Sequence, residues 1–438
     1  MDSKLEAPLP WHQLLEWLQL QIPLVEPREA PGAGYGLFAT AAIPPSTPLF
    51  AVPAHALLNV RTLAPHYPTP SALTAVQLIS LHLLLYRPLG NSHSLDPLFG
   101  PYISILPRKF NSHPLTCHVK GVDVRQLPPS VASALERLSA RFRHDWQTVH
   151  GYVRDNLSVL SQKKGVRLDR DKDALEVDFL WAWLNVNTRC IYHRLKSSRS
   201  DPDNLTLCPI LDFANHRVDG PCMKPRPSDA DLHNASPIPR LGDAFTLLSP
   251  DTPTDCGEEM HLTYGAHPNR TLFVEYGFIV AHKHNRPRGE VDVQDIVEGR
   301  FKEKGNEGRA KESILRETGY WGDWTLDGSP SISYRLITAL RLFHIPWDRS
   351  EDALQRWRDT LTGVRDTISD ANERAWKETV STICSDLIQR AQEHMKLQDD
   401  HSTANEGPNR WLLEVVEMLW EEEYHVALEI SRNIHEIA

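Results

Sequence analysis

The sequence of 438 residues lacks an apolar run long enough to cross a membrane. Its longest candidate, Leu73–Tyr86, is short and contains Gln77 and His82, whereas a membrane-spanning helix needs about 20 mostly apolar residues. The N-terminus, MDSKLEAPLPW, also lacks the basic and apolar segments that together mark a secretory signal. We therefore expect no membrane partner and no secretion.

Cysteine is scarce, and no two cysteines have the C-x-x-C spacing that zinc sites favour. The six cysteines are Cys117, Cys190, Cys208, Cys222, Cys256 and Cys384. A disulfide framework of a small secreted domain would be denser. We expect ordinary thiols, no metal site, and a reducing compartment, either the cytoplasm or the nucleus.

The chain also lacks a surplus of basic residues. Lys and Arg number 47 against 57 Asp and Glu, which gives a net charge of −10. Nucleic-acid-binding domains usually carry a basic surplus, so we expect no nucleic-acid partner. A protein partner is favoured instead. Glu421-Glu422-Glu423 is expected to form a solvated helix face, with the alternative that it attracts a basic protein.

Length and patterning predict two domains. At about 150 residues per domain, the length allows two or three. Gly- and Pro-rich text with short β-type runs occupies about 25–60 and 200–280, and helical periodicity fills about 65–195 between them. The sequence thus predicts an α+β domain over 1–285, interrupted by a helical insert, followed by an all-α domain over 305–438.

A glycine-rich turn, Gly32-Ala33-Gly34-Tyr35-Gly36, interrupts the first strand-type segment. A dinucleotide-binding fold would need G-x-G-x-x-G and an acidic residue about 20 positions later. No Asp or Glu occurs between Glu29 and Asp96, which excludes that fold. Two interpretations remain: a hairpin turn that needs positive φ, or a backbone that lies flat against a ligand.

A second candidate segment is Asp212-Phe213-Ala214-Asn215-His216, which follows the apolar residues Ile210 and Leu211. Three polar side chains at the end of a strand often build a site. Alternatively, Asp212 or Asn215 caps a turn and His216 is a surface or core residue. A metal site with Asp212 and His216 as ligands is disfavoured, because no second His/Asp cluster of matching spacing is present.

The third candidate segment contains two Tyr-Gly pairs. Tyr264-Gly265 follows Gly257-Glu258-Glu259, and Tyr276-Gly277-Phe278 comes after a short apolar stretch at Leu272–Val274. The alternative is that both tyrosines are core residues beside a turn. Each of the three segments is ambiguous alone, but their order along the chain is specific.

Taken together, these motifs resemble the SET-domain methyltransferases, in particular the branch of the Rubisco large-subunit lysine methyltransferase. The resemblance covers roughly residues 25–280, and the helical tail is similar to that branch's substrate-binding region. The motifs that carry it are GYGLFA (34–39), F-x-P-Y-I-x-x-L-P (99–107), Thr188-Arg189, DFANH (212–216) and GEE…YG…N…YGF (257–278).

The resemblance implies a SET-type fold of short strands and S-adenosylmethionine-dependent methylation of a protein lysine. It also implies roles for individual residues. The backbone of Ala33, Gly34 and Tyr35 would lie along the cofactor, with Arg189 on its carboxylate. Asn215 and His216 would hold its two ends, and Tyr276-Gly277-Phe278 would cover its ring. Tyr264 would be catalytic and, with Asp212, would contact the substrate.

Two departures from the family pattern affect these expectations. Cys190-Ile191-Tyr192 follows Arg189, so the substrate contacts there are not defined by the resemblance. The three cysteines of the zinc-binding tail found in histone-type SET enzymes are absent, which is expected for this branch.

The chemistry suits these residue types. A lysine must be neutral to accept a methyl group, although its reference pKa is about 10.4. An apolar channel beside a positive sulfonium lowers the lysine pKa without a strong base. The Tyr264 hydroxyl would orient the amine. Two alternatives stay open: methylation of histidine, or a SET-like binding or scaffold protein without turnover.

Overall fold

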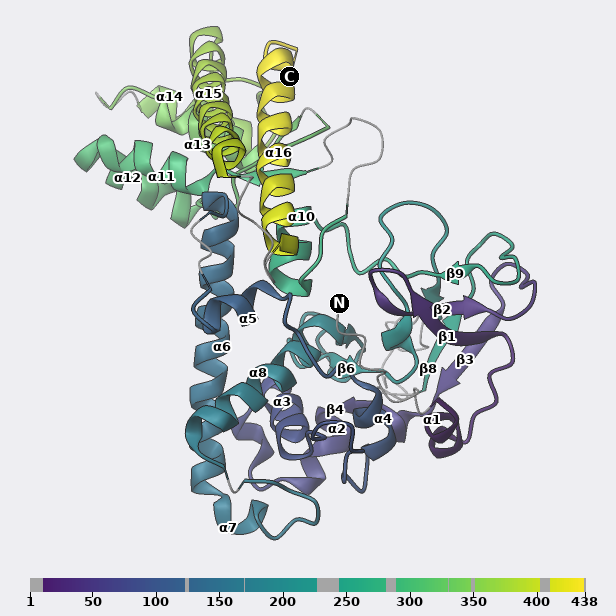
Figure 1. Cartoon of the computed structure of the whole chain (residues 1–438). Coiled ribbons are helices and arrows are strands. Elements are labelled where there is room, and N and C mark those ends of the chain that lie inside the picture. The colour runs from purple at the N-terminus through teal and green to yellow at the C-terminus, as the bar shows by residue number, and fades with distance from the viewer. Residues whose placement is uncertain are drawn as a thin grey trace. The chain divides into compact units, whose positions relative to one another are not determined.

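The computed structural model describes residues 11–122, 126–168, 170–226, 244–280, 289–329, 331–347, 351–401 and 410–436. The chain forms two compact units, each assembled from two stretches of sequence. The first unit lies within Met1–Phe110 and Ala140–Ala266, and the second within Asn111–Ser139 and His267–Ala438. Figure 1 shows the helices and strands of both units.

The strands of the first unit form three small sheets, each with one central strand (Figure 1). In the first sheet, β2 (Gly34–Ala39) pairs with β1 (Val25–Ala30) and β9 (Glu259–Met260). In the second, β8 (Phe245–Leu248) lies between β3 (Pro48–Val52) and β7 (Lys224–Pro225). In the third, β6 (Leu205–Leu207) lies between β4 (Leu58–Asn59) and β5 (Ile191–Tyr192). Each sheet thus joins strands from both predicted strand-rich segments or their borders.

Helices of the first unit form most of its core. They are α1 (Trp11–Leu18), α2 (Val60–Leu63), α3 (Ala75–Leu85), α4 (Gly100–Ile105), α7 (Leu157–Leu160) and α8 (Lys172–Arg189), with short 3₁₀ turns at Ala54–Ala56, Ala64–His66, Pro70–Ala72 and Leu211–Phe213. Helix α6 (Pro129–Asp155) contributes residues to both units. The predicted amphipathic helix at the N-terminus is confirmed, because α1 buries Leu14 and Leu18.

Helix α3 is apolar along nearly its whole length because it is buried on all sides. Nearly all its side chains are buried, including those of Gln77 and His82. Its start is fixed by a capping box, in which Thr74 accepts from the N–H of Gln77 and the Gln77 side chain accepts from the N–H of Thr74. The buried polar side chains are bonded as well: Gln77 Nε2 donates to Asp145 Oδ1 at 2.8 Å.

The second unit is mainly helical, as predicted, and also contains a small sheet that its sequence does not signal. The strands are β10 (Glu290–Asp292), β11 (Thr325–Asp327) and β12 (Ser331–Ile332). The helices are α5 (Pro114–Val119), α10 (Asn269–Thr271), the π-helix η5 (Leu272–Tyr276), α11 (Gln294–Glu303), α12 (Gly305–Glu317), α13 (Tyr334–Phe343), α14 (Glu351–Leu361), α15 (Asp370–His401) and α16 (Arg410–Asn433).

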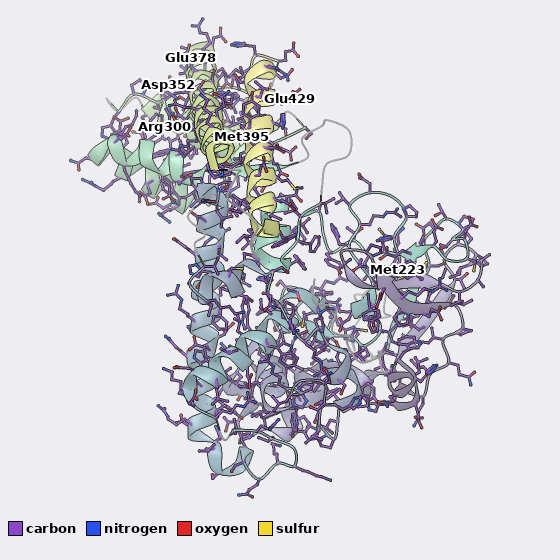
Figure 2. All side chains as sticks on the ribbon, in the orientation of Figure 1. Met223, Arg300, Asp352, Glu378, Met395 and Glu429 are labelled. Atoms are coloured by element: carbon purple, nitrogen blue, oxygen red, sulfur yellow. The ribbon has the colours of Figure 1, made fainter. Side chains whose placement is uncertain are left out.

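Tryptophans form the centre of the second unit's core. Trp324, Trp357 and Trp376 are fully buried, and the indole of Trp357 donates to the Thr338 carbonyl at 3.0 Å. The long helices α15 and α16 lie side by side, as the labelled Met395 and Glu429 show (Figure 2), and the His394 ring stacks on Trp420 with centroids 4.9 Å apart.

Candidate functional site

The glycine-rich turn is a hairpin that leaves its backbone open on one side. Strands β1 and β2 pair from Val25–Ala39 to Ala30–Gly34, and Gly32 and Gly34 both have φ of +78°. A Cβ atom at either glycine would meet no other atom within 4 Å. The positive-φ hairpin is therefore confirmed, and Gly32, Ala33 and Gly34 at its tip are exposed.

Asn215 joins this hairpin to the opposite strand. Its Nδ2 donates to the Tyr35 carbonyl at 3.3 Å and to Glu259 Oε1 at 2.7 Å. The backbone carbonyl of Asn215 accepts from the N–H of Leu262 at 2.9 Å. The amide of Asn215 thus holds Tyr35 and β9 in fixed positions. Gly36 is required beside this contact, because a Cβ there would lie 2.4 Å from Glu259 Oε1.

His216 and Tyr264 lie next to one another. The N–H of Tyr264 donates to His216 Nδ1 at 3.1 Å, and the two rings lie 5.1 Å apart with a tilt of 36°. The Tyr264 hydroxyl donates to the Ala214 carbonyl at 2.9 Å. His216 and Ala214 therefore determine where the Tyr264 ring lies and where its hydroxyl points.

Asp212 lies in a cluster with Tyr102 and Arg189. The Tyr102 hydroxyl donates to Asp212 Oδ2 at 2.5 Å, and Arg189 donates through Nη1 to the Asp212 carbonyl at 2.7 Å. Desolvation raises the pKa of the Asp212 carboxyl to about 6, although the Arg189 charge and the Tyr102 hydroxyl both act to lower it. The carboxyl is therefore ionised at neutral pH and titrates below it.

Two cysteines in the same cluster carry no nucleophilic character. Burial raises the pKa of the Cys190 and Cys208 thiols well above the usual value, and the Asp212 charge raises it further. All six cysteines lie in the described part of the chain, and none forms a disulfide. Cys190, which departs from the family pattern, is therefore a half-buried thiol that stays protonated at neutral pH, directly after α8.

Arg189 has an unused donor. Its Nε is buried and has no hydrogen-bond partner among the described residues. A buried guanidinium N–H without an acceptor is costly, so it signals a missing acceptor. A carboxylate is the natural partner for this group. Arg189, the open hairpin and Asn215 are thus suited to a zwitterionic ligand that carries a carboxylate.

Tyr276-Gly277-Phe278 belongs to the second compact unit, whereas the other predicted site residues belong to the first. The segment ends the π-helix η5, and Gly277 has φ of +82°. A Cβ at Gly277 would lie 2.9 Å from Cδ2 of His113. The rings of Tyr276 and Phe278 meet edge to face with centroids 6.2 Å apart.

His113 supports this turn and was missed by the sequence reasoning. Its Nδ1 accepts from the N–H of Leu115 at 3.2 Å, so it caps the start of α5, and its Nε2 contacts the Glu275 carbonyl at 3.3 Å. Burial lowers the pKa of His113 to about 4, so the ring stays neutral and Nε2 carries the hydrogen. The only sequence signal for this role is that a histidine directly precedes Pro114, at the position that caps the start of α5.

Asn269 closes the same segment and is bound to the C-terminal helix. It exchanges two hydrogen bonds with the backbone of Val280, at 2.9 and 3.1 Å, and its Nδ2 also donates to Glu422 Oε2 at 2.6 Å. The turn at Tyr276 is therefore enclosed between residues 269 and 280.

The expectation of a solvated face at Glu421-Glu422-Glu423 is wrong for two of the three residues. Glu422 and Glu423 are only 6% and 5% exposed. They share a helix face with the buried Leu419 and Val426, because residues three and four apart on a helix lie together. Burial raises the pKa of Glu423 to about 7, and Ser130 Oγ donates to Glu423 Oε1 at 2.5 Å.

The described residues contain neither a metal-site cluster nor a membrane-spanning helix. No group of three or more His, Cys, Asp or Glu side chains in them has the geometry of a metal site. Within the same residues, every helix is too short or too polar to traverse a lipid bilayer.

Comparisons with known proteins agree with the motif pattern. A family model described as Rubisco LSMT substrate-binding matches residues 308–426. Ribosomal lysine N-methyltransferase set11 of Schizosaccharomyces pombe is 26% identical over 85% of this chain and 84% of its own length. Human SET domain-containing protein 4 is 27% identical over 97% of this chain and 91% of its own. The structure of Rubisco LSMT bound to sinefungin and monomethyllysine superposes with a TM-score of 0.63 at 17% identity, over 98% of this chain and 92% of that one.

Proposed function

We propose that this chain, which is similar to a ribosomal lysine N-methyltransferase and to SET domain-containing protein 4, transfers a methyl group from S-adenosylmethionine to a lysine side chain of a non-histone protein. Two relatives with lysine N-methyltransferase names support this activity. The single observation that carries it is the cluster in the first unit, where the open hairpin, Arg189, Asn215, His216 and Tyr264 are connected through hydrogen bonds and short backbone segments.

The two parts of the chain have separate tasks in this proposal. The proposed SET-type catalytic domain covers 1–285 and the proposed helical substrate-binding domain covers 305–438, whereas the two compact units divide the chain at Ala266 and His267 and place Asn111–Ser139 in the second unit. The family-model match at 308–426 supports the second assignment. The net charge of −10 favours a basic protein as substrate, although the buried Glu422 and Glu423 take no direct part in attracting it. The six free thiols favour the cytoplasm or the nucleus.

The residues of the first unit suit the cofactor. S-adenosylmethionine, when bound, supplies a methyl group on a positively charged sulfur. The free Nε of Arg189 offers the donor that the carboxylate of an amino acid needs. The peptide groups at Ala33, Gly34 and Tyr35 offer backbone donors and acceptors, and Asn215 and His216 lie beside them. For Tyr276, Gly277 and Phe278, which belong to the second unit, the sequence resemblance alone supports the role of covering the ring.

Tyr264 is the proposed catalytic residue. Its hydroxyl oxygen and the Ala214 carbonyl lie 2.9 Å apart, so two acceptor atoms stand together. These two acceptors would bind the N–H groups of a neutral lysine amine and so direct its lone pair toward the methyl group. Alignment of this kind can lower a barrier by about 7–11 kcal/mol. The proton that the lysine must lose beforehand passes to solvent.

Asp212 is the proposed second contact to the substrate. The Tyr102 hydroxyl and Arg189 fix its carboxyl and carbonyl groups. At neutral pH the carboxylate would attract the positive charge of an approaching lysine, and desolvation would then favour its neutral form.

The proposal is tested by labelled-methyl transfer into a lysate of cells that lack the endogenous enzyme, followed by mass spectrometry of the modified residue. We expect methyl-lysine, and Tyr264→Phe should lower kcat at least 100-fold. Tyr334→Phe is the matched control, because the Tyr334 hydroxyl also donates to a backbone carbonyl at 2.9 Å, that of Thr360. Methyl-histidine as the product, or full activity of Tyr264→Phe, would contradict the proposal.

A further inference from the structure

The first unit has a pocket that the proposed function does not use. It has a volume of about 180 Å³, far more than one water molecule needs. Tyr67, His82 and Tyr86 form its wall, and His66, Lys163 and Lys164 also line it. These residues come from the segment before α3, from α3 itself and from the loop after α7.

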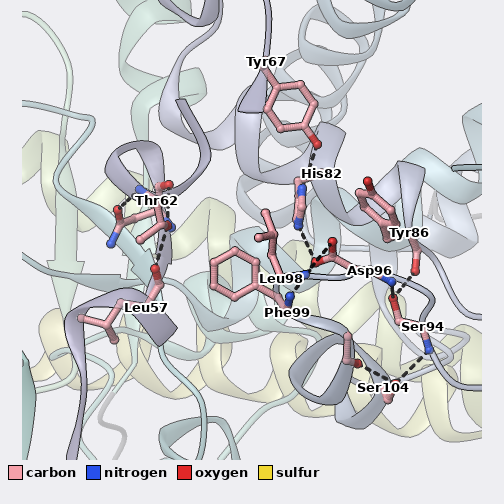
Figure 3. Close-up of polar contacts among 12 residues, drawn as sticks. Leu57, Thr62, Tyr67, His82, Tyr86, Ser94, Asp96, Leu98, Phe99 and Ser104 are labelled. Atoms are coloured by element: carbon pink, nitrogen blue, oxygen red, sulfur yellow. Dashed lines mark hydrogen bonds and ion pairs between the residues drawn. The ribbon is translucent and has the colours of Figure 1, made fainter. Parts of the chain in front are cut away.

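The wall of the pocket is rigid because its polar groups satisfy one another. The Tyr67 hydroxyl lies 2.7 Å from His82 Nδ1, and His82 Nε2 lies 2.9 Å from Asp96 Oδ2 (Figure 3). The N–H groups of Leu98 and Phe99 also donate to the Asp96 carboxylate. Although burial opposes ionisation, these bonds hold the pKa of Asp96 below its usual value. Asp96 is therefore ionised behind the wall, where its charge is bound by these hydrogen bonds and is still felt by Tyr86.

One polar group of the wall remains available. Tyr86 is 6% exposed, and its hydroxyl has no hydrogen-bond partner among the described residues. Figure 3 shows Tyr86 beside His82 with only its backbone carbonyl bonded, and the two rings lie 5.0 Å apart. Burial and the Asp96 charge raise the pKa of Tyr86 to about 12, so the hydroxyl keeps its proton and can donate it to an acceptor.

The charged side chains that line this pocket, Lys163 and Lys164, are positive. The Lys163 ammonium lies 5.2 Å from the centre of the Tyr67 ring, and neither Lys163 nor Lys164 forms an ion pair within the described residues. Burial, together with the Lys163 charge, lowers the pKa of His66, so this imidazole is neutral at pH 7. Two ammonium groups and one phenol O–H are donors without acceptors, which is the donor set that a phosphate group requires.

We propose that this pocket binds a phosphate group, held by Lys163, Lys164 and the Tyr86 hydroxyl. The group is either free inorganic phosphate or the phosphate of a phosphorylated side chain. The inference does not depend on the proposed methyltransferase activity.

The test is calorimetric titration of the full chain at low ionic strength, without cofactor. The probes are inorganic phosphate and the peptide Gly-Gly-phosphoserine-Gly-Gly, with the unphosphorylated peptide as a blank. We expect saturable binding of at least one phosphate-bearing probe and none of the blank. Tighter binding of the peptide would identify a phosphorylated side chain as the occupant, and binding of phosphate alone would identify the free ion.

Three variants assign that binding to the pocket. Lys163→Ala/Lys164→Ala should weaken it at least tenfold, and Tyr86→Phe about tenfold, since a hydrogen bond to a charged group is lost. Lys302→Ala/Lys396→Ala removes the same charge from exposed positions of the second unit and should leave it unchanged. Circular dichroism verifies that each variant is folded. No binding at 10 mM of either probe (roughly the weakest affinity of interest), or equal binding by the lysine variant, would overturn the proposal.

Discussion

The two units hold their predicted site residues in different ways. In the first unit, His216 holds Tyr264, and the neighbouring Asn215 holds Tyr35 and Glu259, so the motif residues support one another in pairs. In the second unit, the Tyr276–Phe278 turn is held by His113 and, through Asn269, by Glu422, residues far away in the sequence. Sequence motifs therefore identify nearly all residues of the first cluster, which we call self-supporting because its members bond to one another. For the Tyr276–Phe278 turn they identify the turn itself but not His113 and Glu422, which support it.

The largest expected effect is a difference in stability between variants of two asparagines, Asn269 in the second unit and Asn215 in the first. Asn269→Ala removes three hydrogen bonds in a buried setting, one of them to a carboxylate. We expect a loss of about 3–4 kcal/mol in the free energy of unfolding. Asn215→Ala removes two bonds at a half-buried position and should cost about 1–2 kcal/mol. Urea denaturation measures both, and equal losses would remove the distinction between the two units.

The next effect concerns two glycines with similar φ. Gly34 and Gly277 have φ of +78° and +82°, but only a Cβ at Gly277 would contact another residue, His113. Gly34→Ala should therefore cost about 1 kcal/mol from backbone strain alone. Gly277→Ala should cost about 2–3 kcal/mol, because overpacking against His113 is added. Thermal unfolding of the two variants checks this order, and a reversed order would contradict the role of His113.

The smallest effect is a dependence of stability on pH from Glu423. Its pKa in the folded protein is about 7, above the ordinary value of 4.5, so the folded chain binds the proton more tightly than the unfolded chain. The contribution to stability is therefore fully present below pH 4.5 and is lost as the pH rises through 7.

Glu423→Gln keeps an acceptor for Ser130 but cannot titrate. Relative to this variant, the wild-type chain should lose about 1–2 kcal/mol of stability between pH 5 and pH 8. Denaturant titrations across this range provide the measurement. Parallel pH profiles for the two proteins would show that Glu423 has an ordinary pKa.

Sequence alone predicted the strand-rich pieces, the helical insert and the helical second part, because each has a distinct periodicity or turn composition. It did not predict the sheet β10-β11-β12, whose strands are only two or three residues long and show no alternation. It also placed Glu422 and Glu423 in solvent, because three adjacent charges usually mark a solvated surface. Their burial depends on Ser130 and Asn269, which become neighbours only in the folded chain.

The central claim is that the self-supporting cluster of the first unit binds S-adenosylmethionine, and a calorimetric titration tests it directly. The wild-type chain should bind the cofactor, and Arg189→Leu should weaken binding at least tenfold because the carboxylate loses its partner. Tyr264→Phe should bind it as the wild type does. No binding at millimolar cofactor (roughly −4 kcal/mol or weaker), or undiminished binding by Arg189→Leu, would contradict this account.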